Sequence, residues 1–110
     1  MRQRTLGHFE QVVLLAILRL NADAYGVSIG REIAECTERR PSPGSLYTTL
    51  DRLEDRGLVT SSFGDPSPAR GGRAKRYFRV TPAGISAVAQ AQRECQRLLQ
   101  GVRLPGVTHA

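Results

Sequence analysis

Ser45, Thr48 and Arg52 share one face of the third helix that the sequence predicts, and Tyr47 and Thr49 lie on its flanks. Residues three and four positions apart are neighbours on a helix surface, so these side chains can act together. Hydroxyls and a guanidinium can hydrogen-bond to base edges and phosphates in a DNA major groove about 12 Å wide. The face therefore favours nucleic-acid contact, while any one of these residues could equally be a tolerated surface residue.

The start of this helix is set by prolines. Pro43 fixes its own φ near the helical value and pushes Ser42 towards extended geometry, so we expect the helix to begin at about residue 43 or 44. Ser42 is the natural N-cap and a further candidate DNA contact, and Gly57 should end the helix. Stiffening of the loop explains Pro41 and Pro43 as well as a functional constraint does. Three leucines form the inward stripe: Leu46, Leu50 and Leu53.

A concentrated basic segment follows. The chain carries a net charge of +6, and between residues 66 and 81 there are five basic residues and no acidic one. Such a segment suits a polyanion-binding surface, although a solvated patch is the alternative interpretation. Alternating patterns predict strands at 59–63 and 77–81 on either side of it, which makes a β-hairpin with a long tip. The basic residues are Arg70, Arg73, Lys75, Arg76 and Arg79.

Three more helices complete the chain. Periodic apolar residues predict helices at 6–20, 26–36 and 83–100, the last with Thr81 as N-cap and Pro82 at its first position. The apolar stripe of the helix at 26–36 is Val27, Ile29, Ile33 and Cys36. The fold class is therefore mainly α with a small hairpin (α+β), in the order α-α-α-β-β-α. We expect a single domain over residues 1–100 and a flexible tail over 101–110.

The same inventory disfavours several other classes. His8 and His109 lie at opposite ends of the chain, and no Ser or Cys has an evident base partner, so an enzyme is not expected. No metal-ligand spacing occurs, and Cys36 and Cys95 fit periodic apolar positions as reduced core residues. The apolar run at 12–18 is too short to cross a membrane and poorly fits a secretory signal. We expect a cytoplasmic protein without metal or cofactor.

Four segments resemble the PadR family of bacterial transcriptional regulators. They are LGHFEQVVLLAIL at 6–18, AYGVSIGREI at 24–33, SPGSLYTTLDRLEDRGLV at 42–59 and RAKRYFRVTPAG at 73–84. The resemblance implies a homodimeric winged helix-turn-helix repressor of the short type, without the larger C-terminal helical domain of other members. It implies that the third helix enters the major groove and that the wing follows the phosphate backbone. The DNA contacts it implies are Ser45, Tyr47, Thr48 and Thr49, with Arg70, Arg73, Lys75 and Arg76 on the wing.

A homodimer is also expected from the apolar surface. The first helix is apolar around more of its circumference than one small domain can cover, and the last helix adds a second apolar stripe. A two-fold dimer predicts a roughly palindromic site on double-stranded DNA. The alternatives are a winged helix for protein interaction, a non-specific nucleic-acid-binding module, and RNA binding through residues 70–73; no effector is identified. The expected dimerisation residues are Phe9, Val13, Ile85, Val88, Cys95, Leu98 and Leu99.

Overall fold

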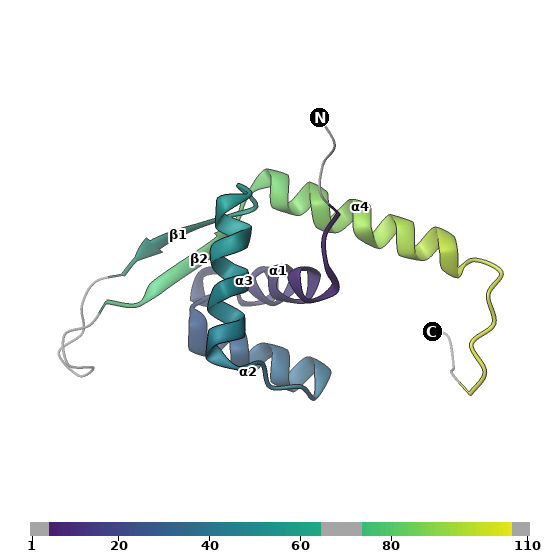
Figure 1. Ribbon diagram of the computed structural model, residues 1–110, viewed down its shortest axis with the longest axis horizontal. Helices are drawn as coiled ribbons and strands as arrows, with labels where there is room; N and C mark the ends of the chain where they lie inside the picture. Colours follow the sequence, from purple (N-terminus) through teal and green to yellow (C-terminus); the bar gives the residue numbers. More distant parts are fainter. Residues whose placement is uncertain (1–4, 65–73, 107–110) are drawn as a thin grey trace.

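The computed structural model describes residues 5–64 and 74–106, and its elements follow the predicted order (Figure 1). A short 3-10 turn, η1, separates the first two helices. The strands form one antiparallel two-stranded sheet in which Val59 pairs with Val80 and Phe63 with Arg76. The prediction of a mainly helical fold with one hairpin is confirmed. The bounds are α1 His8–Leu20, η1 Asn21–Asp23, α2 Gly26–Thr37, α3 Pro43–Asp55, β1 Val59–Phe63, β2 Arg76–Val80 and α4 Pro82–Leu99.

The helix α1 lies at the centre of the core and contacts α2, α3, α4 and β2. Its residues Val13, Leu14 and Ile17 are almost completely buried. This agrees with the wide apolar face that the sequence predicts for this helix. The hairpin and the free end of α4 project on opposite sides of this core (Figure 1). One small core thus holds two elements that extend away from it.

Local capping signals in the sequence correctly placed the starts of α3 and α4 and the end of α3. The Ser42 hydroxyl accepts a hydrogen bond from the amide of Ser45 at 3.2 Å, and the Thr81 hydroxyl accepts one from the amide of Gly84 at 3.1 Å. Gly57 follows α3 with a φ of 75°, a left-handed conformation that glycine adopts at little cost. Such caps depend only on residues close in sequence, which is why the sequence predicts them well.

Three predictions about buried residues are wrong. Cys36 and Cys95 are both exposed. Cys36 lies in the last turn of α2, and Cys95 lies near the end of α4, a helix that extends beyond the others (Figure 1). Val27, expected on the apolar stripe of α2, is 61% exposed, whereas Ile29 and Ile33 of that stripe are buried. Periodicity gave the correct face of each helix but not how far along the helix its neighbours reach.

A nearly buried ion pair connects the start of α1 with the end of α3. Both carboxylate oxygens of Glu10 accept hydrogen bonds from Nη1 of Arg56, at 3.2 and 3.3 Å. The Glu10 Oε1 atom also accepts the amide hydrogen of Gly7 at 2.7 Å and so caps α1. Only 11% of the Glu10 side chain and 17% of the Arg56 side chain are exposed. Loss of either partner would leave the other charge poorly solvated.

We therefore expect Glu10→Ala to lower the free energy of unfolding by about 3 kcal/mol, the size typical of breaking a buried pair on one side. Urea titration followed by circular dichroism measures this change. Glu32→Ala is the control, because it removes an ion pair to Arg19 whose side chain is 63% exposed and whose attraction water screens. Equal loss in both variants would contradict the importance of burial.

Candidate nucleic-acid interface

The outer face of α3 is exposed at the side chains that the sequence selected. Ser45, Thr48 and Arg52 are all exposed, while Leu46, Leu50 and Leu53 are buried against the core. The buried stripe therefore points the hydroxyls of Ser45 and Thr48 outward from the first half of the helix. These two side chains are short, so the helix backbone can come close to whatever binds there.

Thr49 was predicted as a contact of the same kind, and the structure contradicts this. Its side chain is only 6% exposed, since position 49 lies between Leu46 and Leu53 on the inward side of the helix. A β-branched side chain at that position packs against the core. Thr49 positions the helix and cannot reach an external ligand without a rearrangement of α3.

Tyr47 has a structural contact as well as an exposed surface. Its side chain is 42% exposed, and its hydroxyl lies directly against Gly26, where an added Cβ would collide with it. Gly26 is the first residue of α2, so this contact sets the distance between the two helices. Tyr47 borders a groove with Arg31 and Arg40, in front of the start of α3.

Arg31, Arg39 and Arg40 are exposed basic residues that sequence reasoning did not select. Arg40 and Arg31 both line the groove beside Tyr47, at the end of α3 that carries Ser45. The signal that could have found Arg39 and Arg40 is that they form a basic pair directly before Pro41, in the connection from α2 to α3. These residues add positive charge beside the exposed face of α3.

The second half of α3 has the opposite character. Asp51 and Asp55 are exposed there, and Glu54 faces the hairpin. Carboxylates repel a polyanion unless a cation offsets them. The two halves of α3 therefore differ, because the exposed hydroxyls of Ser45 and Thr48 lie in the first half and the carboxylates begin only at Asp51.

Arg76 was predicted as a phosphate contact, but the structure places its guanidinium against α3 and β1. It donates from Nε to the Ser61 hydroxyl at 3.1 Å, from Nη1 to Asp51 at 3.3 Å and from Nη2 to Glu54 at 2.5 Å. The sequence showed Arg76 only as one member of a basic run. The two acidic partners lie 22 and 25 residues away in the chain, so no local pattern could reveal these ion pairs.

Lys75, the other described member of the predicted wing contacts, packs on an aromatic pair. Its ammonium lies 3.7 Å from the ring centroid of Tyr25, and this ring meets Tyr77 edge to face at 5.6 Å. The amide of Phe78 also donates to the carbonyl of Ala24 at 2.8 Å. The strand β2 and the residue before it are thereby fixed to Ala24 and Tyr25, which precede α2. Arg70 and Arg73 lie outside the described residues, and Arg79 is exposed on β2.

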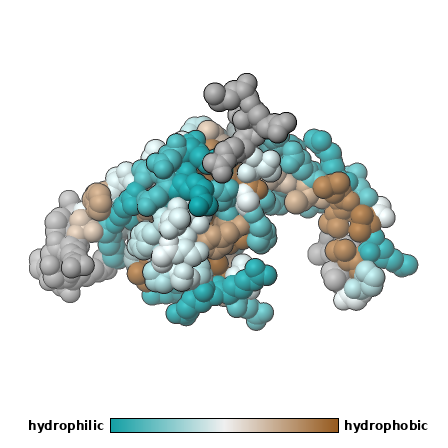
Figure 2. All heavy atoms as spheres, viewed as in Figure 1, coloured by the Kyte–Doolittle hydropathy of each residue, from teal (hydrophilic) through white to brown (hydrophobic). Residues whose placement is uncertain are grey.

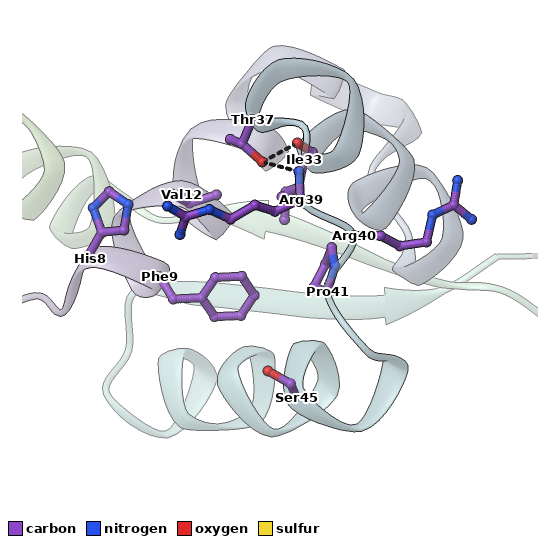
Figure 3. Close-up of a pocket in the computed structure, with 9 residues that line it drawn as sticks. All are labelled: His8, Phe9, Val12, Ile33, Thr37, Arg39, Arg40, Pro41 and Ser45. Carbon is purple, nitrogen blue, oxygen red and sulfur yellow. Dashed lines mark hydrogen bonds between the residues drawn. The ribbon is translucent and has the colours of Figure 1, made fainter.

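A cavity of about 330 Å³ lies between α1, the end of α2 and the start of α3 (Figure 3). Phe9, Val12 and Ile33 provide its apolar wall. Arg39 extends across the cavity towards His8, and its backbone amide donates to the Thr37 hydroxyl at 3.2 Å. Phe9, one of the predicted dimerisation residues, therefore borders an open cavity and is only partly buried.

The other predicted dimerisation residues divide into two groups. Val13 is completely buried and Val88 is 6% exposed, so both belong to the core of one chain and their assignment to an interface is wrong. Ile85 and Leu98 are 50% and 78% exposed, Cys95 is exposed, and Leu99 is half-buried. Beyond α4, Val102 and Leu104 are 49% and 39% exposed and add apolar surface. Figure 2 shows hydrophobic side chains gathered at the right-hand end of the molecule, where Figure 1 places the end of α4 and the segment after it.

The helix pair α2 and α3, followed by a hairpin that contacts α3 and the residues before α2, defines a winged helix-turn-helix protein. The family model described as the transcriptional regulator PadR-like family matches residues 14–90. The chain belongs to this family of transcriptional regulators, which confirms the resemblance drawn from the sequence.

Individual relatives agree with this assignment. The transcriptional regulator Rv3488 of Mycobacterium tuberculosis is 43% identical over 70 residues, which cover 64% of this chain but only 61% of that regulator. A PadR family transcriptional regulator from Eggerthella lenta has the same fold, with a TM-score of 0.67 and 24% identity over 83% of this chain and 77% of its own. The hsRosR protein in its hsRosR-SG complex gives a TM-score of 0.71 with 27% identity, over 90% and 80% of the two chains.

The Glu54 carboxylate makes the stability of this region depend on pH. The hydrogen bond from Ser61, and then the contact with Arg76, hold the pKa of Glu54 below its ordinary value. Because the unfolded chain binds the proton more readily, the stability from these contacts is present above the ordinary Glu pKa. It is lost as the pH falls through the lowered value.

We expect the difference in unfolding free energy between the protein and its Glu54→Gln variant to be largest at neutral pH and to shrink on acidification. Urea titrations between pH 7 and pH 3 measure it. Asp55→Asn is the matched control, because Asp55 is exposed on the same helix and has no ion pair within residues 5–64 and 74–106. A difference that stays constant with pH would contradict the assignment to Glu54.

Proposed function

We propose that this PadR-like regulator is a homodimeric repressor that binds a specific DNA sequence through α3 and the hairpin. The observation that carries the proposal is the exposed face of Ser45 and Thr48, which lies on the first half of α3 and adjoins basic groups from α2 and the connection after it. Hydroxyls on a helix that can enter the major groove are suited to hydrogen-bond base edges. Helix-turn-helix proteins place the first residues of this helix on the bases.

Electrostatics selects the first half of α3 over the second. The positive end of the helix dipole lies at Ser42 and Pro43, where it favours a nearby phosphate. Asp51 and Asp55 would repel phosphates if the second half lay equally close. The helix should therefore approach DNA with its N-terminal turn foremost, with Ser45, Thr48 and Arg52 facing the duplex.

The hairpin would supply contacts that do not depend on base sequence. Lys75 is partly exposed directly before β2, and Arg70, Arg73 and Arg79 are the further cations of the same segment. Cations held beside the recognition helix can neutralise phosphates and release counterions. In this arrangement the hairpin gives affinity and α3 gives sequence preference.

The exposed apolar surface of α4 supports pairing of two chains. Leu98 is 78% exposed and Ile85 is 50% exposed, and on α1 Leu15 and Leu18 are 38% and 41% exposed. Pairing of two chains would remove such side chains from water, which is favourable. A two-fold dimer would present two copies of α3 to a roughly palindromic operator with half-sites about 10 bp apart or a multiple of that.

The place of action would be the cytoplasm of a bacterial cell, on chromosomal DNA. No helix among the described residues is long and apolar enough to cross a bilayer.

The two proposed DNA-contacting elements should respond differently to substitution. Thr48→Ala should weaken binding to a selected DNA site by about 1 kcal/mol or more and leave binding to scrambled DNA nearly unchanged, since it removes a base contact. Ser45→Ala should behave in the same way. Binding isotherms at several salt concentrations on both duplexes measure the effects.

Replacing Arg70, Arg73 and Lys75 together by Ala should weaken binding to both duplexes alike. The log-log salt dependence should flatten by about 0.9 for each phosphate contact that is lost.

Equal effects of Thr48→Ala on both duplexes would overturn the assignment of base contacts to α3. Failure to bind any DNA would favour a winged helix for protein interaction, and a preference for single-stranded RNA would favour binding through residues 70–73.

Pairing of the chains is tested by Leu98→Glu, which places a charge in the proposed interface and should give a monomer at micromolar concentration. Light scattering after size exclusion measures the mass. Gln96→Glu is the control, because it adds the same charge at an exposed polar position of the same helix. A stable monomer of the unmodified protein would refute the dimer.

A further inference from the structure

Arg76 connects three elements that the proposed DNA-binding mode needs in fixed positions. It belongs to β2, and its guanidinium contacts Asp51 and Glu54 of α3 and Ser61 of β1. The Ser61 hydroxyl donates in turn to the other oxygen of Glu54 at 2.8 Å. Glu54 therefore accepts from both strands of the hairpin through its two carboxylate oxygens.

The geometry of this cluster suits positioning. The guanidinium carbon of Arg76 lies 4.9 Å from the centroid of the buried Phe78 ring, which covers one face of the cation. A planar guanidinium with each nitrogen donating to a different group is restrained in orientation as well as in distance. Contact by Lys at the same place could satisfy only one or two of these partners at once.

The cluster is also poorly placed to bind a phosphate. Three of the five N–H donors of Arg76 are already used by Ser61, Asp51 and Glu54, and a phosphate that the other two reached would lie beside both carboxylates. Coulomb repulsion from these carboxylates would offset the new contact. Lys75 and Arg79, on either side in sequence, have no carboxylate partner within residues 5–64 and 74–106.

We propose that Arg76 and Glu54 are positioning residues that set the hairpin relative to α3, so that both elements engage DNA in one register. The inference rests on the proposed DNA-binding function. It assigns to Glu54, an acidic residue, a favourable role in binding a polyanion. Charge alone predicts the opposite, namely that Glu54 lowers the affinity for DNA.

The decisive variant is Glu54→Gln, tested in the full chain on a duplex that the unmodified protein selects from a random-sequence pool. Charge alone predicts tighter binding, because one carboxylate near the DNA is removed. Positioning predicts binding about tenfold weaker, as expected for the loss of an interaction between contacting groups. Asp55→Asn is the matched control and should bind equally well or more tightly, since it removes the same charge from the same exposed helix.

Two further variants separate position from charge. Glu54→Asp keeps the charge but shortens the side chain, and Arg76→Lys keeps the cation but loses the planar set of donors. We expect both to weaken binding to the selected duplex to a similar degree as Glu54→Gln. A phosphate-contacting arginine would instead tolerate the lysine, and Glu54→Asp would then have no effect.

The readout that a general loss of stability would not produce is phosphate ethylation interference. In Glu54→Gln and Arg76→Lys we expect interference to weaken at the phosphates that the hairpin contacts and to persist at those near α3. Circular dichroism and thermal unfolding identify which variants remain folded at the assay temperature. If Glu54→Gln proves unfolded, Glu54→Asp and Arg76→Lys give the same comparison.

The proposal is overturned if folded Glu54→Gln binds as tightly as the unmodified protein or more tightly, or if Arg76→Lys retains full affinity with an unchanged interference pattern. These results differ from failure of the proposed function. If the proposed DNA-binding function is wrong, the unmodified protein itself selects no duplex from the pool, and the variants are not needed to show it.

Discussion

Burial of one leucine stripe is the constraint on which the rest of this structure depends. Leu46, Leu50 and Leu53 are 3% exposed or less, and they hold α3 against the central helix α1. Since a helix has a fixed period, burying these residues decides which others point outward. Ser45 and Thr48 are exposed for this reason, and Thr49 is not. Loss of this packing would leave the hydroxyls without a defined direction, and the hairpin without the acidic side chains to which Arg76 binds.

The two halves of α3 then have separate roles that follow from their charges. The first half carries the cap, the positive end of the dipole and short hydroxyls, all of which tolerate close approach of an anion. The second half carries Asp51, Glu54 and Asp55, and Arg76 of the hairpin forms ion pairs with the first two of these. Acidic residues on a helix proposed to enter DNA are therefore consistent with its function when they fix a neighbouring element and lie away from the leading turn.

Sequence reasoning succeeded where the deciding interactions are local. The order of the elements, the strand β1 and the caps at Ser42 and Thr81 depend on residues a few positions apart, and the structure reproduces them. It failed where a residue's surroundings depend on distant parts of the chain. Val13 has the same apolar type as an interface residue, yet the core closes over it, and Cys95 fits a periodic stripe, yet α4 extends past its cover. Composition and period do not contain that information.

Arg76 shows how a charge count conceals two kinds of function. In the sequence it is one of five cations in a segment without acids, and each of the five looks equally suited to bind phosphate. In the structure the same side chain has Glu54 and Asp51 as partners, while Lys75 beside it lies on the ring of Tyr25. The excess of basic residues therefore overstates the number of cations free to neutralise DNA. Because a cation already paired releases few counterions on binding, the salt dependence of the proposed DNA binding should count the unpaired residues of the hairpin and not its formal charge.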